Sequence, residues 1–388
     1  MRAPARRLLF AAITAAGLSA ALTLPATAGV APDSLVSVTK ATGTAVPGQY
    51  IVTVKKGVSA KSPLSALGVT ASRTFSTVLN GFSAKLSAQQ LSALQRNPAV
   101  TAIEQDQVVN VDTTQSNPVW GLDRIDQRAL PLSKTYTYTA TASNVHAYVI
   151  DTGIDVTHPD FEGRATADFN AFGGPNVDCN GHGTHVAGTI GSETYGVAKN
   201  VRLHAVRWLN CAGAGNLSGA IAAVDFVTAN AQRPAVANTS WNFGWSDTLA
   251  AALTAMMDSG VFLATSAGNT GANSCDRLPR GLTATLAVGA TTITDTRAGF
   301  SSTGPCVDIY APGASILSTQ PGNTTALFSG TSMATPHAAG VAVLYKDEFG
   351  DANQATLSAY LTNTATKGVV QGNLVDTPNR LLFSSPEL

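Results

Sequence analysis

The chain contains 388 residues, and its 24 Lys and Arg are balanced by 24 Asp and Glu. Only 12% of the residues are charged, whereas about 25% is usual for a soluble protein. No basic segment is available to hold a phosphate backbone, so a nucleic-acid partner is not expected. The surface is instead expected to be rich in Ser, Thr, Asn and Ala.

Residues 1–28 have the features of a secretory signal peptide. Arg2, Arg6 and Arg7 give a basic start, and an apolar, Ala-rich run follows over residues 8–24. Small residues at 26–28 then suit cleavage. A membrane anchor is the alternative, but polar residues interrupt the run, and no later stretch is long and apolar enough to span a bilayer. The mature protein is therefore expected to be secreted, soluble and free of the membrane.

Residues 29–47 show little pattern and are predicted to be a linker. A small α+β unit is expected over residues 48–112. Its strands are predicted at 50–54, 79–86 and 99–109, with a helix that Ser87 opens and Asn97-Pro98 stops.

The remaining residues, 113–388, are predicted to form one large domain. Apolar runs of strand length alternate there with helical stretches rich in small residues, which favours an α/β fold with a mostly parallel sheet and helices on both faces. Strands are expected at 145–150, 201–206, 235–238, 261–265 and 284–288, and helices at 185–192, 217–230, 248–259 and 335–349.

The four cysteines, Cys179, Cys211, Cys275 and Cys306, fit an exported protein. An oxidising compartment permits disulfides, and four cysteines allow three pairings. A zinc site built from all four would need closely spaced CxxC-like pairs, whereas the gaps here are about thirty residues or more. Disulfides are therefore favoured, and the spacing alone does not choose among the pairings.

Three fragments supply an acid, an imidazole and a hydroxyl in one order. Asp151 follows a predicted parallel strand, where open α/β sheets place their sites. His182 lies between two glycines just before a helix, and Ser332 lies at the start of a later helix, where the positive end of the helix dipole suits a developing oxyanion. The order Asp, His, Ser differs from that of the α/β-hydrolases. Taken alone, Asp151 is balanced between a catalytic and a turn residue, and Ser332 alone would be a helix cap.

Asn269 and His185 are two further residues with a candidate role near these fragments. Asn269 follows a predicted strand, where its side chain can donate a hydrogen bond to an oxyanion. Alone it would be a turn residue. His185 is three residues after His182, but the adjacent Glu of a metal-binding HExxH motif is missing. His185 is therefore predicted to be a packed structural histidine, as are His146, His158, His204 and His337.

Together these fragments resemble the subtilisin-like serine proteases, and within them the proteinase K and aqualysin group. The similarity covers about residues 120–344, and the matching stretches are 151–153, 180–188 and 330–337. The resemblance implies a three-layer subtilisin-like α/β fold, preceded by a small α+β, ferredoxin-like propeptide. The implied activity is serine endopeptidase cleavage of protein substrates, with Ser332 as nucleophile, His182 as general base and Asp151 orienting His182. Asn269 and the Ser332 N–H would form the oxyanion hole.

The resemblance carries further expectations. Residues 48–112 are similar to an inhibitor-type propeptide, which acts as folding aid and inhibitor and is removed by self-cleavage, and the mature enzyme is expected to be a monomer. The implied disulfides are Cys179–Cys211 and Cys275–Cys306. A structural calcium ion is implied at Asp308, with carbonyl groups at Thr283 and Thr285. The first propeptide helix is expected to be shorter than is usual, because only about twenty residues separate Val54 from Phe75.

The substrate cleft departs from the family pattern. Members of the family usually carry Ser-Leu-Gly-Gly along one wall, where this chain has Ser240, Trp241, Asn242 and Phe243. An extended peptide binds such a cleft as an added strand. The two larger residues are expected to narrow the cleft and to favour smaller side chains before the cut, unless Gly244 takes the place of one glycine in a local insertion. The other wall segments implied by the resemblance are Gly213, Ala214, Gly215 and Ser266, Ala267, Gly268.

Two other functions were weighed against a secreted, self-processed protease. A catalytically silent subtilase fold that binds peptides or proteins is supported only by the altered cleft and is opposed by the intact triad and Asn269. An esterase-type hydrolase would need a GxSxG motif and the chain order Ser, Asp, His, and both are missing.

Overall fold

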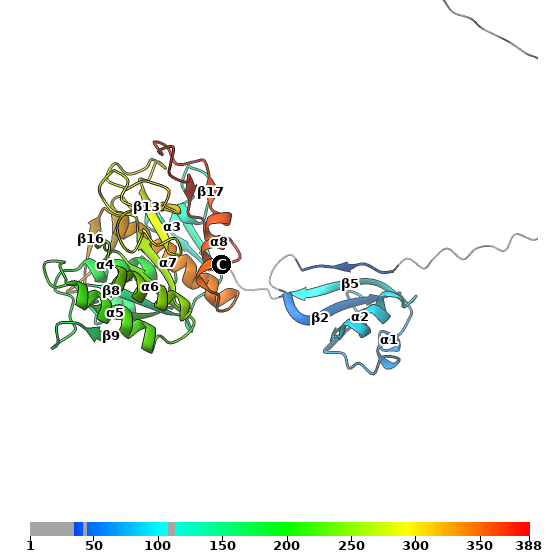
Figure 1. Cartoon of the computed structure of the whole chain (residues 1–388). Coiled ribbons are helices and arrows are strands. Elements are labelled where there is room, and N and C mark those ends of the chain that lie inside the picture. Colours follow the sequence, from blue (N-terminus) through cyan, green and yellow to red (C-terminus); the bar gives the residue numbers. More distant parts are fainter. Residues whose placement is uncertain (1–34, 42–44, 108–112) are drawn as a thin grey trace, which may run out of the picture. The chain divides into compact units, whose positions relative to one another are not determined.

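The computed structural model describes residues 35–41, 45–107 and 113–388. The chain divides into two compact units, residues 1–108 and 109–388, which are drawn in Figure 1. The predicted signal peptide lies outside the described residues. Among the residues that are described, no helix is long and apolar enough to cross a membrane.

The first unit is a five-stranded sheet with two short helices, in the strand order β1-β5-β2-β4-β3. Its core is formed by residues such as Val52, Phe82, Leu94 and Ile103, which are buried between the sheet and α2. Ser87 caps α2 through a capping box with Gln90. The elements are β1 (Val38–Thr39), β2 (Ala45–Val54), α1 (Ser62–Ser65), β3 (Arg73–Phe75), β4 (Gly81–Lys85), α2 (Ala88–Gln95) and β5 (Val100–Gln107).

The predicted linker differs from the sequence analysis, whereas the first helix agrees with it. The predicted linker 29–47 contains β1, which pairs in parallel with β5, and the first residues of β2. This prediction was wrong because a two-residue edge strand has too little alternation to be recognised, and because Pro47 and Gly48 interrupt the β2 pattern. The expected short helix is present: α1 has only four residues.

The second unit is built on a nine-stranded sheet, in the order β17-β18-β14-β13-β12-β11-β8-β10-β9. Every strand pair in it is parallel except β17 with β18. The strands are β8 (His146–Asp151), β9 (Ala165–Asn170), β10 (Arg202–Arg207), β11 (Ala235–Thr239), β12 (Phe262–Ser266), β13 (Leu286–Thr291), β14 (Ile309–Pro312), β17 (Thr366–Lys367) and β18 (Arg380–Leu381). The α/β prediction with a mostly parallel sheet is confirmed.

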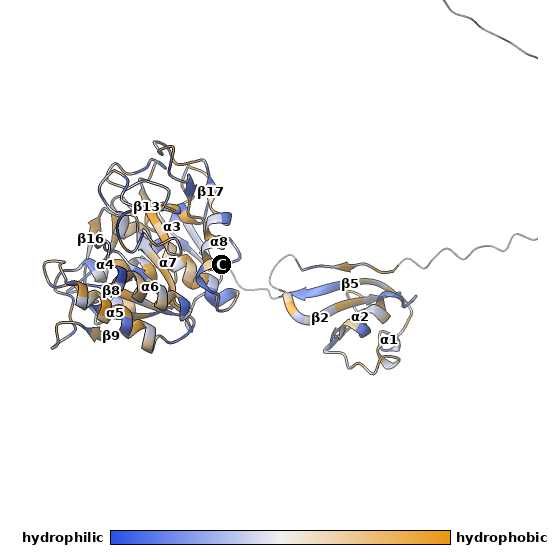
Figure 2. Cartoon of the chain, in the orientation of Figure 1, coloured by the Kyte–Doolittle hydropathy of each residue, from blue (hydrophilic) through white to orange (hydrophobic). Residues whose placement is uncertain are grey.

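Helices cover both faces of this sheet. Successive strand residues face opposite sides, so Val149 and Val236 pack in one core and Tyr148 and Ala237 in the other. Helix α7 is buried along nearly its whole length in the first core, as expected for a helix surrounded by other elements. Figure 2 shows hydrophobic residues along central strands such as β13. On the first face lie α4 (His182–Gly191), α7 (Thr331–Glu348) and α8 (Gln354–Thr364), and on the second lie α5 (Leu217–Asn230) and α6 (Asp247–Asp258).

Two small antiparallel sheets, β6-β7 and β15-β16, and two disulfides complete the second unit. The remaining elements are β6 (Thr113–Ser116), α3 (Trp120–Ile125), β7 (Thr135–Tyr138), the 3₁₀ turn η1 (Pro159–Phe161), β15 (Ile316–Gln320) and β16 (Thr324–Phe328). The disulfides are Cys179–Cys211 and Cys275–Cys306, the pairing implied by the resemblance. They join residues 32 and 31 positions apart, and in the chain-entropy model each stabilises the fold by about 3 to 4 kcal/mol.

Candidate active site

Asp151 and His182 meet at the carboxyl end of the sheet. Asp151 is the last residue of β8 and is fully buried. One of its carboxylate oxygens lies 2.7 Å from Nδ1 of His182, the first residue of α4. The close approach requires Gly183, because a Cβ there would collide with the carbonyl oxygen of Gly153. Such a carboxylate holds the imidazole in one orientation and leaves its Nε2 to face the cleft.

The charge of Asp151 also sets the basicity of His182. Burial lowers the pKa of the His182 imidazole, but the charge and hydrogen bond of Asp151 raise it by more. The pKa therefore lies above the ordinary value of 6.5. At a pH just above this pKa the imidazole is neutral, and it is then suited to accept a proton from a hydroxyl group.

The loop before α4 is organised by Asp178. One carboxylate oxygen accepts hydrogen bonds from Thr152 Oγ1 and the Gly181 N–H, and the other accepts from the N–H and hydroxyl of Thr184. Asp178 thus ties the Asp151 turn to the first turn of α4, where a negative charge also complements the helix dipole. The sequence analysis missed Asp178. Its signal was an acidic residue a few positions before a predicted helix.

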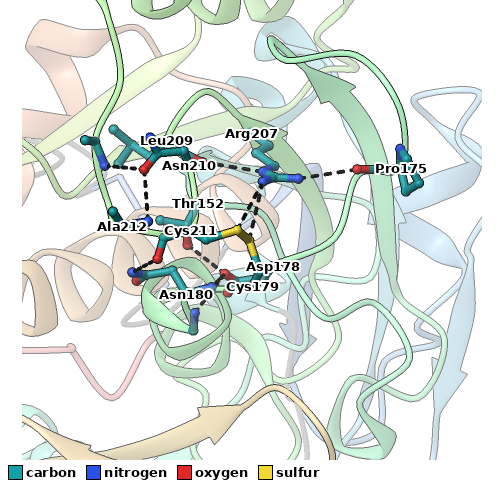
Figure 3. The surroundings of a disulfide bond; sticks show 12 residues. Thr152, Pro175, Asp178, Cys179, Asn180, Arg207, Leu209, Asn210, Cys211 and Ala212 are labelled. Carbon is teal, nitrogen blue, oxygen red and sulfur yellow. Dashed lines mark hydrogen bonds between the residues drawn. A yellow bond between two sulfur atoms is a disulfide. The ribbon is translucent and has the colours of Figure 1, made fainter.

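The Cys179–Cys211 disulfide fastens this loop to one wall of the cleft. Figure 3 shows Cys179 and Asn180 beside Cys211, with the Asn180 side chain donating to the Cys211 carbonyl oxygen at 3.0 Å. Arg207 lies over the disulfide and donates to the carbonyl oxygens of Pro175 and Leu209. The segment that carries His182 is therefore fixed to the segment that carries Gly213–Gly215.

Ser332 is the second residue of α7 and is 9% exposed. Its hydroxyl donates to the carbonyl oxygen of Ser240 at 3.0 Å. The Ser332 carbonyl oxygen in turn accepts from the Ser240 hydroxyl at 3.1 Å. This second bond replaces a helical one, because Pro336 lacks the N–H that would otherwise bond four residues back. The pair fixes the N-terminus of α7 against the cleft wall.

Asn269 is oriented by Thr331. The Asn269 side-chain oxygen accepts from the Thr331 N–H and from the Thr331 hydroxyl, both at 2.9 Å. The amide nitrogen is left to donate elsewhere. A Cβ placed on Gly330 would lie 3.4 Å from that nitrogen and 3.7 Å from the Ser332 backbone nitrogen. The two donors predicted to form an oxyanion hole therefore border the same space.

A cavity of about 400 Å³ lies beside His182. Of the predicted cleft residues, it is lined by Gly213–Gly215 and Ser240–Phe243, whereas Ser266, Ala267 and Gly268 are not part of its lining. The Ser266 hydroxyl nevertheless donates to the Trp241 carbonyl oxygen at 3.4 Å. The segment 266–268 therefore adjoins the 240–243 wall.

The unusual residues of that wall differ in what they do. Trp241 is 6% exposed, stacks edge-on against Trp208 and donates from its indole N–H to the Ile150 carbonyl oxygen at 2.7 Å. Asn242 is exposed. Phe243 is half-buried, and its backbone N–H and C=O both pair with Leu278. Trp241 thus completes the core beneath the cleft, and Phe243 anchors the segment around Leu278 beside it.

The other histidines have structural partners. His185 lies within reach of the Ile316 and Ala326 carbonyl oxygens, and burial lowers its pKa to about 4. Asp168, His204 and His146 form a hydrogen-bonded chain at the opposite, amino-terminal end of the sheet. Among the described residues there is no group of three or more His, Cys, Asp or Glu placed to hold a metal ion.

The predicted calcium residues lie around one small cavity. Thr283, Thr285 and Asp308 line a space of about 250 Å³. One Asp308 oxygen accepts from the Ala287 N–H at 2.8 Å, and burial raises the pKa of this carboxyl to about 6. A partly buried carboxylate beside backbone carbonyl groups, with one oxygen that has no hydrogen-bond partner among the described residues, suits a hard cation such as calcium. A bound cation would also offset the cost of the buried charge.

The sequence analysis did not single out two other neighbouring carboxylates, Asp123 and Asp126. Asp126 has one buried oxygen without a hydrogen-bond partner in the described part of the chain. Burial raises the pKa of Asp126 to about 6, and the neighbouring charge of Asp123 adds to this. Asp123, Asp126 and Gln127 recur at helical spacing, a signal that was available in the sequence.

Two family models match this chain. One, described as the subtilase family, matches residues 143–378, and the other, peptidase inhibitor I9, matches residues 49–112. The chain belongs to the subtilase family. Its first unit is an inhibitor I9 propeptide domain, and its second unit is a subtilisin-like domain.

Named relatives agree with this assignment. The chain is 43% identical over 369 residues to the extracellular serine proteinase of Thermus sp. (strain Rt41A), covering 88% of this chain and 90% of the relative. It is 38% identical over 355 residues to proteinase R of Parengyodontium album, covering 89% and 91%. The crystal structure of a cold-adapted subtilisin-like serine proteinase is also similar, with a TM-score of 0.68 and 45% identity. The match covers 69% of this chain and 99% of the chain in that crystal structure. This subtilase is therefore a serine endopeptidase.

Proposed function

We propose that this subtilase cleaves peptide bonds through Ser332, His182 and Asp151, forming and then hydrolysing an acyl-enzyme. The observation that carries the proposal is the buried Asp151 carboxylate bonded to His182 at 2.7 Å, next to the cavity that Ser240 also lines. Ser332 does not itself line this cavity, but its hydroxyl donates to the carbonyl oxygen of Ser240, which does. Rotation of the Ser332 hydroxyl away from Ser240 would present it to His182.

Each residue has a separate task in this reaction. Nε2 of His182 takes the Ser332 proton as the oxygen attacks the carbonyl carbon, and then delivers it to the leaving amine. Asp151 stabilises the imidazolium that exists between these steps. The Asn269 amide and the Ser332 N–H donate to the oxyanion. Water, activated by the same imidazole, releases the acyl group.

The first unit and the chain start imply how the enzyme is made. We infer that residues 1–28 direct export, that 48–112 form a propeptide, and that self-cleavage near Asp112 releases the mature domain 113–388 as a secreted monomer. The match of 49–112 to peptidase inhibitor I9 supports this order, as does the name of the Thermus relative, an extracellular proteinase. Before release, the propeptide acts as inhibitor and folding aid.

A labelling experiment tests the proposed nucleophile. The full chain is expressed, its self-cleavage is followed by mass spectrometry, and casein hydrolysis is measured. A serine-directed fluorophosphonate should abolish hydrolysis and add its mass to the peptide that contains Ser332. Labelling of another serine with Ser332 unmodified, or a chain that neither matures nor hydrolyses casein, would contradict the proposal. The second outcome would favour the alternative hypothesis of a catalytically silent subtilase fold that binds peptides or proteins.

The pKa of His182 leads to a pH prediction. Because Asp151 raises this pKa above 6.5, the imidazole is protonated, and cannot act as a base, at pH values below the raised pKa. We expect kcat/KM to fall with decreasing pH, with an apparent pKa above 6.5 when it is measured from about pH 5 to pH 9 on a neutral peptide. An acid limb centred well below 6.5 would show that another group limits the rate.

We also propose a structural calcium ion held by Asp308 and the carbonyl oxygens of Thr283 and Thr285, with Asp123 and Asp126 as a second place for one. Arg280 also lines the Asp308 cavity. The basic side chain whose charge lowers the pKa of the Asp308 carboxyl is Arg380. The ion would neutralise carboxylates whose pKa values burial raises to about 6. Its role would be stability, because neither place lies at the Asp151–His182 pair.

Calcium removal should therefore lower thermal stability. A ligand at a hundred times its Kd stabilises a fold by about 2.7 kcal/mol, which corresponds to a fall in Tm of roughly 5 to 10 °C for a domain of this size. The fluorophosphonate-blocked enzyme, which cannot digest itself, is melted with calcium and with EDTA. Asp308→Asn should shrink the difference. Equal melting temperatures with and without calcium would refute the proposal.

A further inference from the structure

One basic side chain is buried beside the substrate cleft without a counter-ion. Arg280 is 2% exposed. Its Nε donates to the carbonyl oxygen and hydroxyl of Ser274, at 2.8 and 2.9 Å, but its Nη1 is buried without a partner in the described part of the chain. No carboxylate among the described residues forms an ion pair with it. Burying an unpaired charge is costly, so its presence requires an explanation.

The position of Arg280 follows from two backbone contacts. Phe243 and Leu278 exchange backbone hydrogen bonds of 2.9 and 3.0 Å, so the segment that carries Arg280 lies against the 240–243 wall. On the other side, a Cβ placed on Gly268 would lie 2.9 Å from both Cζ and Nη2 of Arg280. The guanidinium group therefore lies against Gly268, next to Asn269.

The segment 266–268, which Arg280 contacts at Gly268, is the continuation of β12. Ala267 continues the parallel ladder, because its N–H donates to the Val288 carbonyl oxygen at 3.0 Å. Gly268 lies beyond the end of β12 and has a φ of 100°, and the same Cβ position that meets Arg280 lies 2.9 Å from the Ser302 hydroxyl oxygen. The Ser266 hydroxyl bonds to Trp241 across the cleft floor. Arg280 therefore lies beside Gly268 at one wall and, two residues after Leu278, close to Phe243 at the other.

We propose that Arg280 determines specificity for the residue before the scissile bond, and that it selects an acidic side chain there. The inference rests on the proposed function, because it takes 240–243 and 266–268 as the walls that hold that residue. A carboxylate would accept from the free Nη1 and supply the missing counter-ion, and guanidinium groups bind carboxylates well. The bulk of Arg280 against Gly268 also leaves less room for a large aromatic side chain.

The charge of Arg280 persists at neutral pH. Burial lowers its pKa, and the nearby Arg277 lowers it further, to about 10. Arg277 is half-exposed and lies 4.0 Å from the exposed Asp276, so it has a carboxylate nearby and water around it. The charge of Asp276 also acts on Arg280, but Arg280 is 2% exposed and forms no ion pair with a described carboxylate, so it would gain more from a bound carboxylate than Arg277 would.

A pair of substrates isolates the effect of charge. Two chromogenic peptides differ only in Glu or Gln before the cleaved amide, so their shapes match. We expect the mature wild-type enzyme to hydrolyse the Glu peptide with a kcat/KM about ten to a hundred times higher, as for a charge-assisted hydrogen bond. Arg280→Met should bring the ratio to about one or below, and Arg280→Lys should restore part of it. Arg277→Gln, the matched change at the exposed neighbour, should keep most of the wild-type ratio between the Glu and Gln peptides.

Several outcomes would overturn this proposal. One is a wild-type enzyme that hydrolyses the Gln peptide as fast as the Glu peptide, a measurement that needs no variant to fold. Another is an unchanged ratio in Arg280→Met. If both peptides are poor substrates, the cleavage sites in casein decide, since Glu and Asp must be enriched before the cut. Casein hydrolysis without that enrichment removes only the acidic preference, whereas absence of hydrolysis removes the proposed function itself.

Discussion

Ser332→Ala is expected to leave the chain at its full length and to reduce peptide hydrolysis about a millionfold, the loss typical when the serine of such a triad is removed. The proposal uses the Ser332 hydroxyl as nucleophile. Ala removes this hydroxyl and its hydrogen bond to the Ser240 carbonyl oxygen, but it keeps the bond from the Ser240 hydroxyl to the backbone carbonyl of residue 332. Self-cleavage is followed by mass spectrometry of the expressed chain. For kinetics, the variant is matured by a trace of wild-type enzyme that is then blocked with a fluorophosphonate.

Ser329 provides the matched control. It lies three residues earlier, is exposed, and accepts a hydrogen bond from the Ser315 N–H at 2.8 Å. Ser329→Ala should therefore mature and hydrolyse peptides at nearly the wild-type rate. A Ser332→Ala chain that still cleaves itself near Asp112 would show that another group is the nucleophile. Loss of activity in both variants would point to damage to the local fold instead.

The sequence predicted the central sheet well because its strands are buried on both faces. The expected strand 145–150 is β8, His146–Asp151, and the expected strand 261–265 is β12, Phe262–Ser266. Such strands are continuous apolar runs that need no knowledge of their neighbours. The edge strand β9 was missed, because most of its residues are partly or fully exposed and its pattern is polar.

Helix starts were less predictable because residues distant in the chain set them. Helix α4 begins at His182 rather than at the expected 185, since Gly181 adopts a left-handed conformation and Asp178 satisfies the first N–H groups. Helix α7 begins at Thr331 rather than at 335, and the Ser240 hydroxyl occupies the carbonyl that Pro336 leaves free. The sequence contained all these residues, but only the fold brings them together.

The same limit applies to the cleft. The residue types at Asp151, His182, Ser332 and Asn269 occur in recognisable motifs, so each could be named from the sequence, although their roles stay proposals. Arg280 belongs to no motif. Its position depends on the pairing of Phe243 with Leu278 and on the bare face of Gly268, which join three segments of the chain. Specificity residues of this kind become visible only when those segments are packed.

Asn269→Ala should lower kcat about a hundredfold to a thousandfold and leave KM nearly unchanged. The Asn269 amide nitrogen and the Ser332 N–H border one space, where negative charge develops only in the transition state. A donor to that charge contributes little to substrate binding, so its loss falls on kcat. Steady-state kinetics on one chromogenic peptide, with kcat and KM determined separately, measure the effect.

Two further variants separate donation from loop structure. Asn269→Asp keeps the oxygen that accepts from the Thr331 N–H and hydroxyl but removes the N–H donor, so it should lose at least as much kcat as the Ala variant. Asn273→Ala, in the same loop, removes a side chain that accepts only from the Cys275 N–H among the described residues and should have little effect on kcat. If Asn269→Asp retained wild-type kcat, the amide of Asn269 would not be an oxyanion donor, and the stabilisation would have to come from the Ser332 N–H at the start of α7.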